Sequence, residues 1–493
     1  MTVSALALAG AAHAAGSQST VTQSGPGQNA VVNQSGSTAG AVSTITQSNA
    51  NNTGNVVQSG NDNKSSVSQT GNGGDATVTQ SGGENGSVVN QASGATATVT
   101  QSGSEIGYGI APPNNSSTVT QTAGATGAMA TVTQAGELNL SDVQQNAAAD
   151  ATVLQTGVYN HSFVTQNASG ASATVTQTGS PASGGPGVGN GDNKSVVLQN
   201  GASTATVTQT ASPAYLGGYP SNDSDVAQDA DGAVATVDQT GNDNRSIVKQ
   251  FSNADNADAI VDQDGTNNFS DVRQNGQNGL SEVLQNGNAN SATVVQNANG
   301  TFAPYPVGNF DYTRTYIEQI GDGNRSNMST TGLDHEAVNT QYGDRNQSDL
   351  TQAGYYNTAR ADQSNGTFSA DDNRSTIGQT GDLQLAMTYQ SGDRNRLNIT
   401  QSGENNDISD SGDVFGNADF FGSGLRQSGD DNEADVSQSG EDNLLVGVQT
   451  GNSNDMFVTQ SGSGNKAFVH QLTSGNTSTM TQTGTNGTAT VTQ

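Results

Sequence analysis

The sequence of 493 residues contains no cysteine, which excludes disulfides, thiolate metal sites and a cysteine nucleophile. It also contains no tryptophan, and aromatic residues make up only 4% of the chain. Because only 31% of the residues are apolar, a conventional globular core is not expected. Two classes of protein remain: a disordered low-complexity chain, or a repetitive solenoid with a narrow and partly polar core.

The sequence is also short of positive charge. It has 14 Lys and Arg residues against 44 Asp and Glu residues, which gives a formal net charge of -30. Phosphate backbones and anionic lipids repel such a chain, so neither nucleic acid nor a membrane surface is expected as a partner. No segment approaches the roughly 18 to 20 apolar residues that cross a bilayer, so no membrane span is expected either.

The first predicted segment is residues 1–14, MTVSALALAGAAHA. It resembles the apolar and cleavage regions of a secretory signal, with Ala12, His13 and Ala14 as an A-x-A site, although no Lys or Arg precedes them. We therefore expect export, and a secreted, extracellular or cell-surface protein that consists of residues 15–493.

A repeat dominates what the sequence does contain. In the stretch QSGNDNKSSVSQTGNGGDATVTQSGGENGSVVNQ, glutamines recur every eleven residues, at Gln58, Gln69, Gln80 and Gln91. Reading back from each glutamine in steps of two applies the period of a β-strand, in which alternate side chains share one face. From Gln69 to Gln274 the segments then fall into two alternating classes, N-x-S-x-V-x-Q and A-x-V-x-Q. One repeat is therefore two strands and two turns, about 22 residues in all.

The side chains between these positions are often charged, as Arg245 and Lys249 are on either side of Val248. The Asn, Ser or Ala, Val and Gln positions are therefore predicted to point inward. Turns centred on glycine, such as SGND and TGNG, separate the strands. The predicted fold is all-β: a two-sided, amyloid-like β-solenoid of strand, turn, strand and turn, with about 22 residues per rung. It covers residues 15–493, with a degenerate stretch near 405–425.

Stacked rungs place each inward glutamine about 4.8 Å from the next, so the side-chain amide of one can donate to the carbonyl of the other. Such a ladder satisfies buried amides only when the rungs stay in register. Thr330 stands where a glutamine is expected. The predicted inward ladder comprises Gln69, Gln80, Gln91, Gln101, Gln121, Gln134, Gln166, Gln177, Gln199, Gln209, Gln239, Gln250, Asn63, Asn85, Ser65 and Ser87. Gln482 and Gln493 are the predicted assembly end, where backbone groups of the last strands stay unpaired.

The longest insertions between strands are residues 102–115, 179–193, 211–223 and 297–312. All four follow a strand that the sequence assigns to the alanine class or its equivalent. Since insertions in repeat proteins map to loops, we expect the four on one edge of the solenoid.

The repeat resembles the curlin repeat of curli subunits, S-x5-Q-x-G-x-x-N-x5-Q. It matches best through Gln80, Gly82, Asn85 and Gln91. An earlier copy, SVSQTGNGGDATVTQ, has Ser65, Gln69, Gly71 and Gln80 in the Ser, Gln, Gly and second-Gln places, and departs from the pattern at Asp75. The resemblance covers nearly the whole chain and rests on many copies.

This resemblance implies an extracellular structural protein, a subunit of the functional amyloid in curli-type, pilus-like bacterial fibres that serve biofilm matrix, cell adhesion and surface colonisation. The implied partners are further copies of the chain in a homopolymer, a nucleator subunit and an outer-membrane export channel. The chain departs from the usual curlin subunit in two ways: it has many more repeats, and the targeting segment that usually precedes the first repeat is nearly absent.

Nothing in the sequence suggests catalysis. The histidines His13, His161, His335 and His470 lie far apart, and no G-x-S-x-G elbow with a matched His and acid occurs, so we expect neither enzyme activity nor a cofactor. Acidic turns such as SGDDNEAD resemble Ca²⁺ loops, but Asp varies in place from rung to rung. This variation favours ordinary solvated turns over the alternative of weak Ca²⁺ binding.

Pairs of threonines flank the inward valine on strands of the alanine class, as Thr77 and Thr79 do. Flat Thr ladders on β-solenoids resemble the ice-binding surface of some antifreeze proteins. A monomeric secreted solenoid that binds a ligand or ice on this face is therefore the alternative function. Thr is also a good exposed strand residue in its own right, and Leu154 and Asp238 interrupt the ladder. A disordered surface polymer is the third hypothesis.

Overall fold

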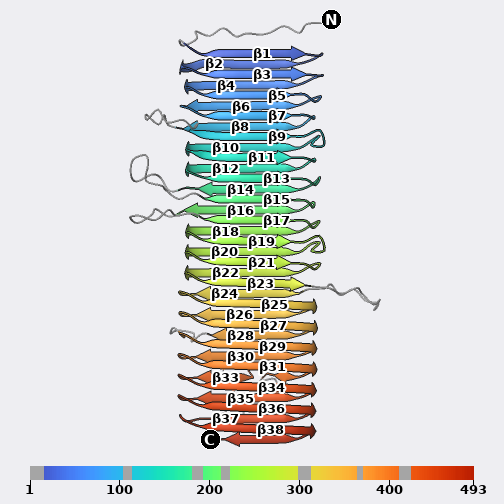
Figure 1. Cartoon of the computed structure of the whole chain (residues 1–493), viewed down its shortest axis with the longest axis vertical. Coiled ribbons are helices and arrows are strands. Elements are labelled where there is room, and N and C mark those ends of the chain that lie inside the picture. Colours follow the sequence, from blue (N-terminus) through green and yellow to red (C-terminus); the bar gives the residue numbers. More distant parts are fainter. Residues whose placement is uncertain are drawn as a thin grey trace, which may run out of the picture. The chain divides into compact units, whose positions relative to one another are not determined.

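The structure is a computed structural model that describes residues 16–103, 114–179, 193–211, 222–297, 313–363, 370–409 and 424–493. In these ranges the chain forms β-strands and turns and no helix. It divides into two compact units between Val248 and Lys249. In each unit the strands are stacked and, apart from β32 and β33, successive strands point in opposite directions (Figure 1).

The first unit contains two parallel sheets, one of odd-numbered and one of even-numbered strands. The odd-numbered strands are β1 (Gln18–Ser24), β3 (Val42–Ser48), β5 (Lys64–Gln69), β7 (Gly86–Gln91), β9 (Asn115–Gln121), β11 (Asn139–Gln145), β13 (His161–Gln166), β15 (Lys194–Gln199) and β17 (Asp223–Gln228). The even-numbered strands are β2 (Asn29–Ala39), β4 (Thr53–Asn61), β6 (Asp75–Gly82), β8 (Thr96–Gly103), β10 (Met129–Glu137), β12 (Asp150–Val158), β14 (Ser172–Thr178), β16 (Thr204–Ala211) and β18 (Val234–Asn242). Strand β19 (Arg245–Gln250) includes residues on both sides of the division.

The second unit also contains two parallel sheets. One consists of β20 (Asp258–Thr266), β22 (Leu280–Asn288), β24 (Arg314–Ile320), β26 (Glu336–Tyr342), β28 (Thr358–Gln363), β30 (Leu385–Ser391), β32 (Asp407–Ile408), β33 (Leu425–Ser428), β35 (Leu444–Thr450), β37 (Lys466–Gln471) and β39 (Thr488–Thr492). The other consists of β21 (Phe269–Gln274), β23 (Ser291–Asn297), β25 (Arg325–Leu333), β27 (Gln347–Tyr355), β29 (Arg374–Asp382), β31 (Arg396–Glu404), β34 (Glu433–Glu441), β36 (Asp455–Ser463) and β38 (Thr477–Thr485).

Paired residues occupy the same place in neighbouring rungs. Gln69 lies beside Gln91 and Gln80 beside Gln101, and these pairs are 22 and 21 residues apart in the sequence. Each rung is therefore one strand of each sheet with two turns. This confirms the predicted all-β, two-sided β-solenoid in each unit.

Alternation of side chains makes a thin core. In β6 the side chains of Ala76, Val78 and Gln80 are completely buried, whereas Thr77 and Thr79 between them point outward and are half-buried. Each wall contributes one column of branched apolar residues, flanked by small residues and glutamines. The small side chains let the two walls approach closely, which is how a sequence with few apolar residues fills its interior.

The turn after Gln80 shows why glycine recurs two residues after the ladder glutamine. Gly82 has a φ of 83°, and a Cβ at this position would lie 1.6 Å from the carbonyl oxygen of Gly103 in the next rung. Only glycine fits both the backbone angle and this close approach. Glu84 is also left-handed, with a φ of 59°, immediately before Asn85 enters the core.

The predicted degenerate stretch near 405–425 is a strand interrupted by an insertion. Strands β32 and β33 pair with successive parts of β30, and both pair with β35. Gln390 still donates to Gln427 at 2.8 Å, although the two are 37 residues apart. Residues 410–423 of the stretch lie outside the described part. The two short strands share one strand position, so the sheet continues through them.

Most of each predicted insertion lies outside the described residues, in 104–113, 180–192, 212–221 and 298–312. The first three follow β8, β14 and β16, which belong to one sheet of the first unit. The fourth follows β23, in which Ala292 lies beside Ser270 of β21, a strand of the serine class. The prediction that all four follow an alanine-class strand is therefore wrong for the fourth, because an alanine there occupies a serine position.

Residues 1–14, the predicted signal segment, also lie outside the described residues. None of the residues described here belongs to a helix long and apolar enough to cross a membrane.

Candidate functional site

The feature that recurs from rung to rung is a buried glutamine, so the glutamine columns are the candidate functional site. The predicted glutamines fall into two columns, one in each sheet. Gln69, Gln91, Gln121, Gln166, Gln199 and Gln250 end odd-numbered strands, and Gln80, Gln101, Gln134, Gln177, Gln209 and Gln239 lie in even-numbered strands. All twelve side chains are at most 1% exposed.

Each glutamine amide binds in two directions. The Nε2 of Gln69 donates to the Oε1 of Gln91 at 2.8 Å and to the backbone carbonyl of Thr53, in the opposite wall, at 2.8 Å. The Nε2 of Gln80 likewise donates to Gln101 at 2.8 Å and to the carbonyl of Lys64 at 2.9 Å. The column thus links successive rungs along the stack and links the two walls across it.

Six buried glutamines of the first unit belong to the columns but were not among the predicted ladder residues: Gln34, Gln47, Gln58, Gln145, Gln155 and Gln228. Gln145 accepts from Gln121 at 2.8 Å and donates to Gln166 at 3.0 Å, so it closes the gap between two predicted members. The period-two pattern of Asn139, Ser141 and Val143 before it was the signal that could have identified it.

Asparagines form a second ladder at the turn that leads into the odd-numbered strands. The Nδ2 of Asn85 donates to the Oδ1 of Asn63 at 2.9 Å and to the carbonyl of Ser81 at 2.8 Å, which closes the turn. Asn115 donates to Asn85 at 3.0 Å. These donors point toward lower residue numbers, whereas the glutamine donors point toward higher ones. The amide dipoles of the two ladders therefore oppose each other along the stack.

The inward serines behave differently from the amides. Ser65 and Ser87 are 5% and 4% exposed, so both point inward. The Oγ of Ser65 donates to the Oγ of Ser43 at 3.3 Å, but the Oγ of Ser87 has no hydrogen-bond partner. The serine column is therefore not a continuous ladder, because the short hydroxyl bridges neighbouring rungs at Ser65 but not at Ser87.

Of the predicted assembly residues, Gln482 lies in β38 and Gln493 directly follows β39. Among the described residues, β38 pairs with β36 and β39 pairs with β37. Gln482 accepts from Gln460 at 2.9 Å, and Gln493 accepts from Gln471 at 3.3 Å. Their own Nε2 groups donate to the carbonyls of Lys466 and Thr477. Gln482 is half-buried and Gln493 is exposed.

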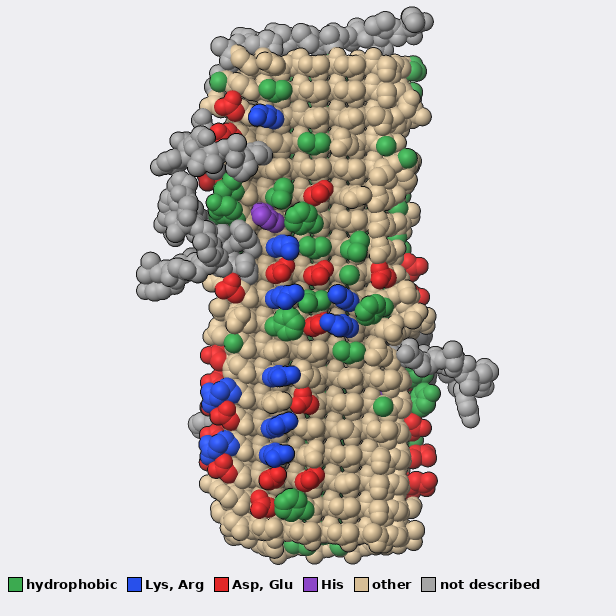
Figure 2. Space-filling model, viewed as in Figure 1, with side chains coloured by type: hydrophobic (Ala, Val, Ile, Leu, Met, Phe, Trp, Pro, Cys, Tyr) green, Lys and Arg blue, Asp and Glu red, His purple; other side chains and the backbone are tan. Residues whose placement is uncertain are grey.

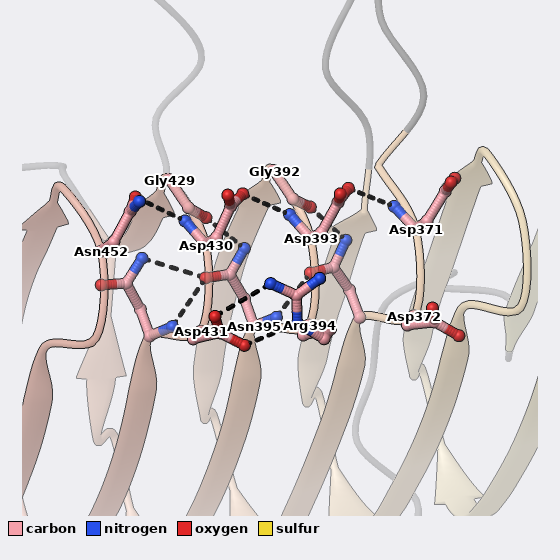
Figure 3. A network of polar contacts seen from close by, with 12 residues as sticks. Asp371, Asp372, Gly392, Asp393, Arg394, Asn395, Gly429, Asp430, Asp431 and Asn452 are labelled. Carbon is pink, nitrogen blue, oxygen red and sulfur yellow. Dashed lines mark hydrogen bonds and ion pairs between the residues drawn. The ribbon is translucent and has the colours of Figure 1, made fainter.

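One edge of the second unit carries a column of aspartates (Figure 3). The backbone N–H of Asp371 donates to the carboxylate of Asp393 at 3.1 Å, and that of Asp393 donates to Asp430 at 3.0 Å. Beside them, Arg394 makes two hydrogen bonds to Asp431, at 2.7 and 2.9 Å. Blue and red side chains are interspersed along this edge of the second unit in Figure 2.

The arginine on this edge alters the ionisation of its partner. Hydrogen bonds from Arg394 lower the pKa of Asp431, and Arg345 lowers the pKa of Asp372 in the same way. The carboxylates of the aspartate column accept backbone N–H groups of neighbouring turns. Across the described ranges, no group of three or more His, Asp or Glu residues is placed to hold a metal ion.

The outward threonines of the first unit form a column in register. It runs through the even-numbered sheet as Thr77, Thr98, Thr131, Thr152, Thr174, Thr206 and Thr236. The parallel column that contains Thr79 is interrupted by Leu154 and ends at Asp238. The column of seven threonines, here called the Thr face, carries no charge at its seven positions, although Asp75 and Asp150 are exposed at the start of β6 and β12.

The histidines are not brought together as a site. His161 and His470 point outward from β13 and β37 and are half-buried, whereas His335 is 1% exposed at the turn before β26. His13 lies outside the described residues.

The family model described as "Curlin associated repeat" matches residues 50–82, 147–179, 220–251, 370–403, 429–462 and 451–484. Each of these segments holds three ladder glutamines, as 50–82 holds Gln58, Gln69 and Gln80. The matched segments therefore contain members of the glutamine columns. No curated protein matches the chain.

Proposed function

The chain is a curlin-repeat protein, and from this premise we propose that it is an extracellular structural subunit of curli-type fibres. Copies assemble end to end, because a rung of one copy continues the stack of another. The observation that carries this proposal is the amide ladder. Its hydrogen bonds join residues that occupy the same place in successive rungs, and nothing in that geometry requires both rungs to belong to one chain.

The last described strands support the same proposal. Among the described residues, strands β38 and β39 are each paired on one side only, with β36 and β37 respectively. An edge of this kind is a template for pairing with another strand. Gln482 and Gln493 stand at this edge and accept from Gln460 and Gln471, at 2.9 and 3.3 Å, as a buried ladder glutamine accepts from the one before it.

Family membership supports the biological part of the proposal: a secreted or cell-surface protein that contributes to biofilm matrix, adhesion and surface colonisation. It also supports a nucleator subunit and an outer-membrane export channel as partners. The role proposed is structural and needs neither catalysis nor a cofactor.

Fibre growth from the purified full chain tests the proposal. We expect thioflavin-positive fibres with a meridional reflection near 4.8 Å. Replacing both Gln482 and Gln493 by Lys should slow seeded elongation at least about tenfold, because the incoming rung would meet two charges in place of amide donors. Thr79→Lys, on the outer face, is the matched control and should elongate at nearly the normal rate. A chain that stays monomeric under all these conditions rules the proposal out.

The second candidate function is binding of a ligand or an ice crystal by a monomer through the Thr face of the first unit. The seven-residue Thr column in register favours it. Thermal hysteresis that is lost in Thr98→Lys, while Thr118→Lys on the opposite sheet keeps it, would support this function. Absence of hysteresis in the wild-type chain excludes ice as the ligand.

A further inference from the structure

One rung of the second unit departs from the ladder pattern at three inward positions. It is made of β25 and β26 and is here called the weak rung, residues 325–342. Thr330 takes the place of the ladder glutamine, lying between Gln296 and Gln352 in the register. His335 takes the place of the turn asparagine, and Asn339 takes the place of the branched apolar residue, beside Ile317.

Thr330 breaks the glutamine ladder. Its side chain is 2% exposed, and its Oγ1 has no hydrogen-bond partner. The Oε1 of Gln352, which would accept from a glutamine at 330, is also buried without a partner. On the other side, the Nε2 of Gln296 donates to the Oγ1 of Thr315 at 3.1 Å. The threonine side chain is too short to reach either neighbour.

Asn339 places an amide in an apolar column. Its Nδ2 donates to the Oγ of Ser326 at 2.7 Å, but its Oδ1 is buried without a partner. A buried acceptor that has lost water and gained no donor destabilises the folded state. The same rung therefore holds two independent polar defects, at 330 and 339.

His335 adds a group that can be charged. Its Nε2 lies 3.1 Å from the carbonyl of Thr331, so the proton of the neutral ring is on Nε2. Its Nδ1 is buried and has no partner. A second proton would therefore be placed on a nitrogen that has no acceptor, inside a side chain that is 1% exposed.

The groups around His335 favour its protonated form, but they do not outweigh the effect of burial, which favours the neutral form. Burial lowers its pKa below 6.5 as the largest influence, while the carbonyls of Thr331 and Gly354 and the carboxylates of Asp334 and Asp382 raise it. The neighbouring Glu336 is 3.8 Å from Arg314. Since the pKa is lower in the folded than in the unfolded chain, the unfolded chain binds more protons, and the stability of the rung falls as pH drops below about 6.5.

We propose that the weak rung is an acid-triggered opening point of the second unit: it opens before its neighbours, and protonation of His335 opens it further. The opened rung exposes the backbone of β23 and β27, which pair with β25, and of β24 and β28, which pair with β26. Acid thus creates a local strand edge without unfolding the rest of the stack.

Hydrogen–deuterium exchange of the full chain tests this proposal directly. The matched control in the same sample is the rung of β34 and β35, which has Gln438 and Asn443 where the weak rung has Thr330 and His335. After correction for intrinsic rates, we expect amides of 325–342 to exchange at least about tenfold faster than those of 433–450 at pH 7.5. The ratio of the exchange rates of the weak rung and the control rung should rise about another tenfold at pH 5.

Two substitutions separate the causes. His335→Asn installs the residue found in other rungs and should abolish the rise on acidification. Thr330→Gln should reduce the difference in exchange rate between the two rungs at pH 7.5. It should leave the faster exchange of the weak rung at pH 5 in place. The converse, Asn443→His, should make the control rung acid-sensitive.

Equal protection of the two rungs at both pH values would overturn the proposal, and so would an acid response that survives His335→Asn. Exchange is read rung by rung and does not depend on fibre formation, so this result stands apart from the test of fibre assembly.

Discussion

The two units close their turns differently. In the first unit, asparagines such as Asn85 and Asn160 lie before the odd-numbered strands, whereas small residues such as Ala149 and Ala171 lie before most even-numbered strands. In the second unit, from β25 onward, amide residues lie before most strands of both sheets, as Asn346 before β27 and Asn443 before β35 do. The first unit therefore has one amide edge and one apolar edge, and the second has two amide edges.

The difference also appears on the surface. The cations of the first unit are Lys64, Lys194 and Arg245, and all others lie in the second unit. The first unit has the Thr face, and the second has paired arginines and aspartates such as Arg394 and Asp431. One backbone plan thus tolerates two kinds of outer surface, because the ladder fixes the register from within.

Substitution of the turn glycines should have the largest effect on the free energy of unfolding. It tests whether both edges of the second unit resemble the amide edge of the first. Gly157 and Gly354 have φ values of 84° and 116°, and a Cβ would lie 2.2 and 2.0 Å from a carbonyl in the next rung. Gly157→Ala and Gly354→Ala should each lower the free energy of unfolding by about 3 kcal/mol or more. Urea unfolding followed by circular dichroism measures this loss.

The control for the glycines is Gly378→Ala. Its Cβ would meet only the carbonyl oxygen of Ile399, at 3.9 Å, and its backbone has no positive φ. This substitution should be neutral or slightly stabilising. A large loss at Gly378, or none at Gly354, contradicts the account of the turn.

The next effect concerns the asparagines themselves. Asn160→Ala removes donors to Asn139 at 2.9 Å and to the carbonyl of Thr156 at 2.8 Å, and we expect a loss of about 1–3 kcal/mol in the free energy of unfolding. Asn443→Ala in the second unit should cost a similar amount. On the apolar edge, Ala149→Ser should change stability by less than about 1 kcal/mol. Equal losses at all three positions would show that the two edges do not differ.

Repair of the ladder should have a smaller, stabilising effect. Thr330→Gln supplies a donor for the orphaned Oε1 of Gln352 and should raise the free energy of unfolding by about 1–2 kcal/mol. Thr351→Gln, on an exposed position of the next strand, controls for the change of residue type. No gain, or an equal gain in both variants, argues against a ladder defect at 330.

The smallest effect is expected at the ion pairs. Arg394 and Asp431 are about half exposed, so solvent and salt weaken their attraction. Because the pKa of Asp431 is lowered in the folded chain, its contribution is present above the unfolded-state pKa, near 4, and is lost as pH falls through the folded-state pKa. Asp431→Asn should shift the thermal midpoint slightly at pH 7 and low salt. The shift should become smaller as pH falls below 4 and in 1 M salt.

Much of the fold could be predicted from the sequence, because alternation in steps of two decides which side chains point inward. Gln69, Val78 and Asn85 were placed in this way. Alternation cannot reveal hydrogen-bond directions: that Asn85 donates backward and Gln69 forward depends on side-chain length and turn geometry. For the same reason, the sequence could not predict that the Ser87 hydroxyl has no hydrogen-bond partner.

Other features had no local signal in the sequence. Strands β32 and β33 occupy one strand position because both pair with β30 and β35. The sequence shows only that the glutamine spacing is broken there, and not that the sheet continues. The wall to which β23 belongs follows from pairing rather than from Ala292. The left-handed backbone at Glu84 is imposed by the turn and not by its residue type.

The central claim is that in-register amide ladders hold the rungs together and continue from one copy to the next. A high-resolution electron-microscopy map of the fibres tests it most directly. The account predicts rungs about 4.8 Å apart, Gln69 stacked on Gln91 inside the core, and an unbroken glutamine column across the junction beyond Gln482 and Gln493. Glutamines on the outer surface, or copies joined side by side with these columns ending at each junction, would contradict it.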